Sequence, residues 1–289
     1  MLIKFFNWYG GKYRIVHIIL ALLPDGITAF YEPFMGSAAV TLNKWRSSIE
    51  VINDLDPDIA FLFKLMADKE KGKTLLDRLL KIEYSESEFI RAKRASENRF
   101  RYIQDEFRKA ELIYILITQS FNATRTSFRR GITNSEYQCS QRYNLPLVYQ
   151  RLQGVKVLNM NGIDLMKEIK HNPTAFAFLD PPYRHELRSK GATKVYRCEL
   201  PHKEQKRLLK TIADARCKIM LCGYRSKEGV DLYDQYLLPY GWKHYKLAEL
   251  VKSCQCNMQK RDIGEEWIWV NYELPYVAKY FINLKTCEI

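Results

Sequence analysis

Short apolar segments that end at a charged residue or a turn recur along the chain, and they predict the strands of a sheet. These segments cover residues 28–31, 50–53, 155–158, 174–179 and 218–222. The run at 174–179 is apolar almost throughout, which is typical of a strand buried on both faces. Two later runs, 245–251 and 267–272, are predicted to form an antiparallel pair that closes the sheet. The pattern therefore favours an α/β fold.

Stretches with helical periodicity lie between these strands. An amphipathic stretch follows Lys12, and another helix is expected to begin at Pro201 and to end near Ala215. From residue 58 to residue 149 the strand pattern is absent, and helical periodicity appears at 59–66, 74–82 and 110–119. We therefore expect a sheet domain formed by residues 1–57 and 151–289, interrupted by a mostly helical insertion at residues 58–150.

Composition and charge favour a location in the cytoplasm and a polyanionic partner. The 289 residues are 47% hydrophobic, yet no apolar run reaches the roughly 18 residues of a membrane span. The first residues lack a signal-peptide pattern, and the seven scattered cysteines are interpreted as free thiols in a reducing compartment. We expect a cytoplasmic protein with no membrane partner. The net charge of +13 favours a polyanionic partner without identifying it.

The stretch Phe176-Ala-Phe-Leu-Asp-Pro-Pro-Tyr183 places the strongest candidate chemistry at the end of a predicted strand. Two prolines cannot continue a strand, and Pro181 biases Asp180 toward an extended backbone. In an open α/β sheet, ligands bind at this edge. A carboxylate, a backbone carbonyl and an aromatic ring at one edge suit an amino group on a planar aromatic base. Asp180 and the Pro181 carbonyl would accept its N–H groups, and Tyr183 would stack on the ring through its face. A simple strand-ending turn is the competing interpretation.

Three motifs together resemble a known family. Asp180-Pro181-Pro182-Tyr183 resembles the catalytic motif of amino-methylating DNA methyltransferases. With Trp8-Tyr-Gly-Gly-Lys12 and Tyr31-Glu-Pro-Phe-Met-Gly36, the chain resembles the Dam-type (alpha group) DNA adenine-N6 methyltransferase family, although the middle third matches only loosely. The resemblance implies a doubly wound, Rossmann-like class I methyltransferase sheet with a DNA-recognition insertion. It also implies S-adenosyl-L-methionine as cofactor, and the N6 amine of a flipped adenine in double-stranded DNA as target.

Cofactor-binding residues are expected in the first two motifs. Gly10-Gly11-Lys12 lacks the spacing of a phosphate-binding loop. By resemblance, Tyr9 would lie beside the methionyl end of the cofactor and Lys12 near both cofactor and base; a glycine turn with a surface lysine is the alternative. Glu32, Phe34 and Gly36 belong to a strand–loop–helix turn with one glycine, which suits a cofactor without phosphate. Glu32 would favour its positive charge, and Ser37 could cap the following helix.

Two further acidic residues complete the expected cofactor site, to which Asp180 itself also belongs. Asp54 follows a strand about 20 positions after the glycine turn, where a carboxylate suits ribose hydroxyls. A helix cap at Asp54 is the alternative, since Asp56-Pro57 can start a helix. By family position, Asp164 would accept a hydrogen bond from the adenine amine of the cofactor, with a helix cap as the competing interpretation. The sulfonium leaving group requires no metal.

Basic residues in the insertion predict a DNA-binding surface. They alternate with polar and aromatic residues, as expected of a surface that contacts phosphates and bases. The alternative is that the charged residues lie on solvated helix faces and the aromatic residues belong to the core. We expect the segment 120–141 to form a hairpin or loop in the major groove, carrying Asn122, Arg125, Arg129 and Arg130. The long loop after Tyr183 is expected to act as a lid or binding loop. It adds Arg188 and Lys190 to the DNA-binding candidates.

Other functions remain open at this stage. A cytosine-N4 methyltransferase, an enzyme acting on an RNA or protein amine, and a catalytically silent DNA-binding relative are the alternatives. The first two usually carry a residue other than aspartate where this chain has Asp180. We expect a monomer of bacterial or phage origin; a companion restriction endonuclease and the recognition sequence do not follow from the chain. The late motif Glu266–Asn271 also resembles the family, but its residues alone indicate no chemistry.

Overall fold

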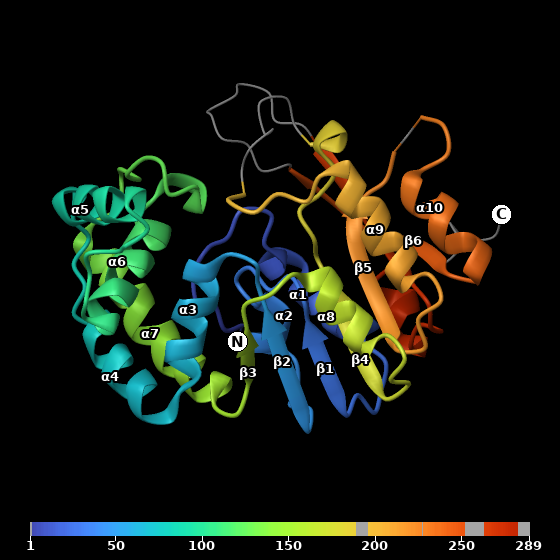
Figure 1. Ribbon diagram of the computed structural model, residues 1–289, viewed down its shortest axis with the longest axis horizontal. Coiled ribbons are helices and arrows are strands. Elements are labelled where there is room, and N and C mark those ends of the chain that lie inside the picture. Colours follow the sequence, from blue (N-terminus) through green and yellow to red (C-terminus); the bar gives the residue numbers. More distant parts are fainter. Residues whose placement is uncertain (1, 189–195, 227, 252–262, 283–289) are drawn as a thin grey trace.

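A computed structural model describes residues 2–188, 196–226, 228–251 and 263–282, and Figure 1 shows a mixed α/β architecture. Within these residues, seven strands form one sheet in the order β3-β2-β1-β4-β5-β7-β6. The strands are β1 (Ala29–Glu32), β2 (Ile49–Asn53), β3 (Lys156–Leu158), β4 (Ala175–Leu179), β5 (Lys218–Tyr224), β6 (Lys243–Val251) and β7 (Ile263–Val270). Strands β1 to β5 run parallel, whereas β7 is antiparallel to both β5 and β6. The predicted strands and the antiparallel pair are confirmed.

Helices cover both faces of the sheet, which explains why its central strands are apolar throughout. One face packs against α8 (Gly162–Ile169), α9 (His202–Ile212) and α10 (Leu232–Leu237), and the other against α1 (Val16–Leu22). In β4, Ala175, Ala177 and Leu179 point to the first face, and Phe176 and Phe178 point to the second. This alternation is the period of two expected of a strand. The short helix α2 (Ala39–Asn43) follows β1.

Between β2 and β3 the chain forms a group of helices beside the β3 edge of the sheet (Figure 1). They are α3 (Pro57–Ala67), α4 (Lys69–Leu79), α5 (Glu86–Glu97), α6 (Glu106–Thr118) and α7 (Asn134–Leu152). The predicted helical segment at 59–66 is confirmed within α3, and those at 74–82 and 110–119 are confirmed except at their ends, because α4 ends at Leu79 and α6 at Thr118. Phe5, near the N-terminus, packs on this group, with its ring 5.1 Å from that of Phe63 and 5.7 Å from that of Tyr114. The group thus shares a core with residues that precede β1.

Two local predictions are wrong. The segment 120–141 is not one loop, because Thr133 and Glu136 form a reciprocal capping box that starts α7 at Asn134. Only its first part folds back as a hairpin, joined by a bridge between Ser120 and Phe128. Ser37 does not cap α2: the cap position belongs to Ala38 at φ 51°, with no side-chain cap bond. The carboxylate of Glu32, at the end of β1, supplies the missing acceptor for the backbone N–H of Thr41.

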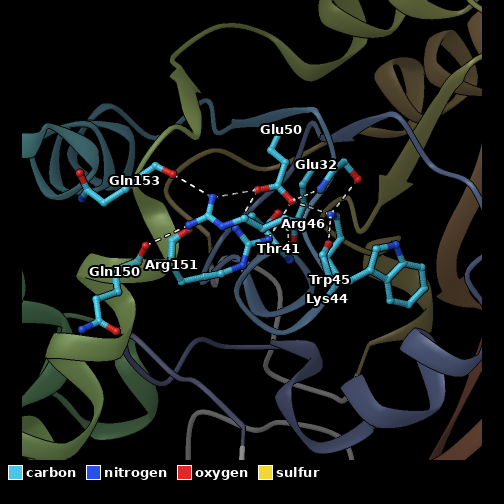
Figure 2. A network of polar contacts seen from close by, with 10 residues as sticks. Glu32, Thr41, Lys44, Trp45, Arg46, Glu50, Gln150, Arg151 and Gln153 are labelled. Atoms are coloured by element: carbon cyan, nitrogen blue, oxygen red, sulfur yellow. Dashed lines mark hydrogen bonds and ion pairs between the residues drawn. The ribbon is translucent and has the colours of Figure 1, made fainter.

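A buried ionic cluster joins the end of α7 to β2 (Figure 2). Both guanidinium Nη atoms of Arg151 donate to the carboxylate of Glu50, at 2.7 and 2.8 Å, and Lys44 Nζ lies 2.6 Å from Glu50 Oε1. Burial opposes the charge on Glu50, but the hydrogen bonds from Arg151 and Lys44 lower its pKa below the ordinary value. Arg46 donates to the backbone carbonyls of Gln150, Arg151 and Gln153. The last helix of the group between β2 and β3 is therefore fixed to the sheet.

Candidate active site

A cavity of about 470 Å³ opens at the carboxyl ends of β2, β1 and β4, where the strand order reverses. This is the volume and the position of a typical small-molecule site in an α/β sheet. Asp54, Glu32 and Asp180 end or follow these three adjacent strands, so parallel pairing brings them to one edge. The rest of the lining comes from residues 8–9, 11–12, 34–37, 123–125, 161–162 and 196–200, among others. The cavity is therefore lined by acidic residues at the strand ends and by loop residues from distant parts of the chain.

Asp180 forms an ion pair with Lys12, whose Nζ lies 2.8 Å from Asp180 Oδ1. The same Nζ donates to the carbonyl of Gly10 at 3.0 Å. Burial opposes the charge on Lys12, but the carboxylates of Asp180 and Glu266 raise its pKa above the ordinary value. Burial raises the pKa of Asp180 as well, against the opposing effect of the Lys12 ammonium. Lys12 is thus an ammonium held against the expected catalytic carboxylate rather than a surface lysine.

Side chains from other elements hold the Asp180-Pro-Pro-Tyr183 turn through hydrogen bonds to its backbone carbonyls. Gln205 on α9, itself buried, donates to the carbonyl of Pro182 at 2.7 Å and accepts from the Tyr233 hydroxyl at 2.7 Å. Arg188 Nε donates to the carbonyl of Tyr183 at 2.8 Å. These bonds occupy the two carbonyls that follow Pro181. Asp180 and Pro182 line the cavity, whereas Pro181 and Tyr183 lie outside its lining.

Tyr183 contacts a residue to which sequence reasoning gave no role. Its hydroxyl donates to Glu266 Oε2 on β7 at 2.6 Å, and its ring meets that of Tyr224 edge-on at 4.7 Å. Glu266 is 5% exposed, and burial raises its pKa against the opposing effect of Lys12. The available signal was a pair of acidic residues, Glu265 and Glu266, in a strand that is otherwise uncharged. Which side chain Glu266 meets depends on the β5–β7 register, which pairs Glu266 with Tyr224.

Glu32 is a buried carboxylate that also caps a helix. Its Oε2 accepts the backbone N–H of Thr41 at 3.0 Å and the Thr41 hydroxyl, which replaces the cap predicted for Ser37. Burial raises the pKa of Glu32 to about 7, although the bonds from Thr41 oppose the shift. The side chain lines the cavity. It is therefore poised to become fully ionised when a cation binds beside it.

Asp54 ties the glycine turn to the next strand. Its Oδ2 accepts from the Gly36 N–H and its Oδ1 from the Asp56 N–H, each at 2.9 Å. Gly36 has φ 47°, and a Cβ there would lie 2.6 Å from the indole nitrogen of Trp8, so a side chain is excluded. Burial raises the pKa of Asp54 to about 6. The cap of α3 is Asp56, so Asp54 remains available to the cavity that it lines.

Phe34 and Tyr9 supply the less polar walls. A Cβ on Gly162 would lie 2.8 Å from the Phe34 ring, so that turn and the start of α8 pack closely. Tyr9 meets the ring of Tyr196 edge-on at 5.8 Å, and the Tyr196 hydroxyl donates to the Tyr9 carbonyl at 3.1 Å. Both rings line the cavity together with Trp8. Aromatic walls beside acidic groups suit a flat, positively charged ligand.

Asp164 does not lie in this cavity, contrary to expectation. Its carboxylate, 44% exposed, pairs with Lys167 on the same helix at 2.9 Å and with Arg207 on α9 at 2.5 Å. The alternative of a helix cap is also wrong, because Asn161 Oδ1 accepts the Ile163 N–H and caps α8. The start of α8 thus reaches the cavity through Asn161 and Gly162.

The DNA-binding candidates occupy different environments. Arg125 is 15% exposed, lies 2.9 Å from Asp56 and 3.7 Å from Asp58, and stacks over Trp8. The side chain of Arg188 is 5% exposed and its guanidinium lies 2.7 Å from the Glu199 carboxylate, so it does not form part of a basic surface. Arg129, Arg130 and Asn122 are exposed; Arg130 pairs with Glu86 at 3.1 Å. Lys190 lies outside the described residues.

The loop that carries Arg125 has an unusual backbone. Asn122, Ala123 and Arg125 have φ values of 49°, 57° and 61°, a left-handed conformation that is uncommon for residues other than glycine. From the opposite side, Arg197 reaches the carboxylate of Asp58 and lies 3.6 Å from Asp56. Two loops far apart in sequence therefore meet over the first turn of α3. Such strained loops often belong to functional sites.

The chain is similar in sequence to a known family of enzymes. The model of the D12 class N6 adenine-specific DNA methyltransferases matches residues 8–248. A DNA N-6-adenine-methyltransferase of Escherichia phage P1 is 25% identical over 214 residues, 73% of this chain and 28% of the relative. A type II methyltransferase of Lactococcus lactis subsp. cremoris is 26% identical over 190 residues, 62% of this chain and 65% of the relative. The chain thus spans less than two thirds of the length of either relative.

Proposed function

Because this chain belongs to the D12 class N6 adenine-specific DNA methyltransferases, we propose that it methylates the N6 amine of adenine in duplex DNA. The observation that carries the proposal is the convergence of Asp54, Glu32 and Asp180 on one cavity at the switch point of the sheet. Two of these carboxylates suit a cationic nucleoside cofactor. The third, Asp180, suits the amine that is to be methylated.

The residues present fit S-adenosyl-L-methionine. Glu32 would balance its ammonium or sulfonium charge, Asp54 would accept hydrogen bonds from the ribose hydroxyls, and Phe34, Trp8 and Tyr9 would pack on its apolar surface. When bound, this cofactor supplies an electrophilic methyl group attached to a sulfonium. The cavity volume of about 470 Å³ is sufficient for a ligand of this size.

The target amine would donate its two N–H groups to the Asp180 carboxylate and the Pro181 carbonyl. The carbonyls of Pro182 and Tyr183 already accept hydrogen bonds, so of the three carbonyls that follow Asp180 we assign this role to that of Pro181. Hydrogen bonding in this geometry directs the lone pair of the amine out of the ring plane. The nitrogen would thereby be aimed at the methyl group that the bound cofactor supplies. It then loses the proton that it donates to Asp180, whose burial raises its pKa.

DNA would be held by the helical group between β2 and β3. We propose that residues 58–150 form the recognition segment of a doubly wound class I methyltransferase, with Arg129, Arg130 and Asn122 on its exposed loop. Arg125 would contribute indirectly, by holding that loop to the first turn of α3. Tyr183 would stack on the flipped base. We further propose that the enzyme acts as a monomer.

Methylation of DNA from a methylation-free host tests the proposal directly. Duplex DNA incubated with the protein and S-adenosyl-L-methionine should gain N6-methyladenine, which mass spectrometry of nucleosides detects and base-resolved sequencing assigns to a site. Asp180→Ala should lower single-turnover methylation by at least 100-fold while changing cofactor affinity only modestly. The exposed Asp25→Ala, outside the proposed recognition segment, is the matched control and should behave as the wild type. N4-methylcytosine, or no modified base at all, would overturn the proposal.

A further inference from the structure

A buried cluster beside the cavity contains more negative than positive charge. Lys12 Nζ lies 2.8 Å from Asp180 Oδ1 and 3.9 Å from Glu266 Oε2, and the side chains of Lys12 and Glu266 are 4% and 7% exposed. The Tyr183 hydroxyl donates to the same Oε2 atom of Glu266 at 2.6 Å. One ammonium therefore faces two carboxylates, and at 2.8 Å it is bonded to only one of them.

The proposed reaction conflicts with this resting arrangement. The target amine donates one N–H group to the Asp180 carboxylate, whose Oδ1 already accepts from Lys12, and Asp180 loses the negative charge that Lys12 faces when it takes up the proton of the methylated amine. An ammonium displaced from its partner inside a buried site incurs a large desolvation cost unless a new partner replaces the old one. Water can reach little of the Lys12 side chain. The protein itself offers such a partner at 3.9 Å, the carboxylate of Glu266.

We propose that Glu266 receives the ammonium of Lys12 when the target amine binds Asp180, and so acts as a positioning residue for the reaction. This inference rests on the proposed function. At 3.9 Å the Lys12–Glu266 contact is too long for a hydrogen bond, but a displacement of about 1 Å would form one. A carboxylate oxygen has two acceptor sites, so Oε2 can accept from Lys12 while it keeps the Tyr183 hydroxyl.

The transfer of the ammonium also changes Asp180. The Lys12 ammonium counteracts the effect of burial on the pKa of Asp180. When Lys12 moves to Glu266, that opposing effect weakens, and Asp180 becomes a better acceptor for the proton that the methylated amine loses. Glu266 itself neither gains nor loses a proton in this scheme. The Tyr183 hydroxyl fixes the receiving oxygen in place.

Binding measurements that need no methyl transfer test this directly. The protein is titrated, with S-adenosylhomocysteine present, against two duplexes that carry adenine or purine at the target position. Purine lacks the 6-amino group, so only adenine should displace Lys12. Glu266→Gln preserves the shape of the side chain but removes its charge, and it should lower the ratio of adenine to purine affinity at least threefold. Equal weakening of both duplexes would overturn the proposal and indicate a purely structural role.

Single-turnover rates provide a second arm. Glu266→Gln should slow methylation at least tenfold with less than a threefold change in cofactor affinity, and it should have no further effect in a Lys12→Met background. Full additivity of the two substitutions would contradict the transfer of the ammonium. If Glu266→Gln does not fold, Tyr183→Phe replaces it and should lower the affinity ratio at least twofold; an unchanged ratio would count against the proposal. Absence of N6-methyladenine with the wild type would instead reject the proposed function.

Discussion

The carboxylate of Asp54 accepts a hydrogen bond of 2.9 Å from the backbone N–H of Gly36, and this bond ties the turn after β1 to the end of β2. A single side chain thereby shapes one wall of the cavity and presents its remaining acceptor sites to a ligand. Loss of this side chain should affect ligand binding before it affects chemistry, since neither contact belongs to the reacting amine.

Asp54→Ala should weaken the affinity for S-adenosyl-L-methionine by about 10- to 100-fold, in line with the loss of one or two charge-assisted hydrogen bonds. The maximal rate should recover at high cofactor concentration, because a ribose contact is equally strong in ground and transition states. Calorimetry and cofactor-dependent rates measure the two effects separately. A lower maximal rate with unchanged affinity would remove Asp54 from cofactor binding.

Cofactor affinity should depend on pH through Glu32. Its pKa is about 7 in the protein, and a cationic ligand beside it favours the ionised form. Affinity should therefore rise between pH 6 and pH 8, by up to about tenfold per unit, with release of a proton. Glu32→Gln should bind more weakly and show a flatter profile. A wild-type profile that matches the variant's would separate Glu32 from the cofactor charge.

The free energy of unfolding should also depend on pH through the Glu32 carboxyl group, but it should fall as pH rises, whereas cofactor affinity should rise. Burial raises the pKa of Glu32 from 4.5 to about 7, so its contribution is fully present below pH 4.5 and is lost as pH rises through about 7. Over this range the free energy of unfolding should fall by on the order of 3 kcal/mol more in the wild type than in Glu32→Gln. Urea unfolding at several pH values measures the difference. The exposed Glu168→Gln is the control.

Substitution of the exposed arginines of the proposed recognition segment should affect DNA methylation differently from substitution of the mostly buried Arg125. Arg129→Ala or Arg130→Ala should either change the ranking of single-base variants of the recognition site, at a cost of about 1–3 kcal/mol, or reduce the salt slope by about one unit. Arg125→Ala should leave the ranking unchanged, because Asp56 and Asp58 already hold its guanidinium. Methylation of each site variant at several salt concentrations decides between these roles. A changed ranking in Arg125→Ala would restore it as a base reader.

Removal of Arg151 should destabilise the whole protein. Arg151→Met leaves the carboxylate of Glu50 buried with one partner fewer, a change that typically costs about 3–5 kcal/mol. The exposed Arg91→Met removes a surface ion pair with Glu88 and should cost at most about 1 kcal/mol. Equilibrium unfolding in urea measures both. Equal costs for the two variants would mean that the buried cluster contributes little.

Local patterns were sufficient to predict most of the sheet and the acidic part of the cavity. Glu32, Asp54 and Asp180 each end or follow an apolar run, and parallel strands bring such positions together without further information. Glu266 could not be assigned in this way, since its contact with Tyr183 depends on the register of two antiparallel strands. The prediction that Asp164 lies in the cofactor site failed for a similar reason. Its partner Arg207 lies on another helix, and no local sequence pattern indicates that the two residues pair.

The cluster of Glu50, Lys44 and Arg151 also constrains how such enzymes can be recombined. α7 ends at Leu152, and Arg151 on its last turn is paired with Glu50 on β2. A chimera that exchanges residues 58–150 would cut this helix just before its anchor and join a foreign helix to a native arginine. A junction placed after residue 153 would import whatever the donor carries at position 151, and Glu50 would need a matching partner. Under the proposed function, exchange of the recognition segment between relatives is thus coupled to one ionic contact that belongs to neither the proposed DNA surface nor the proposed cofactor site.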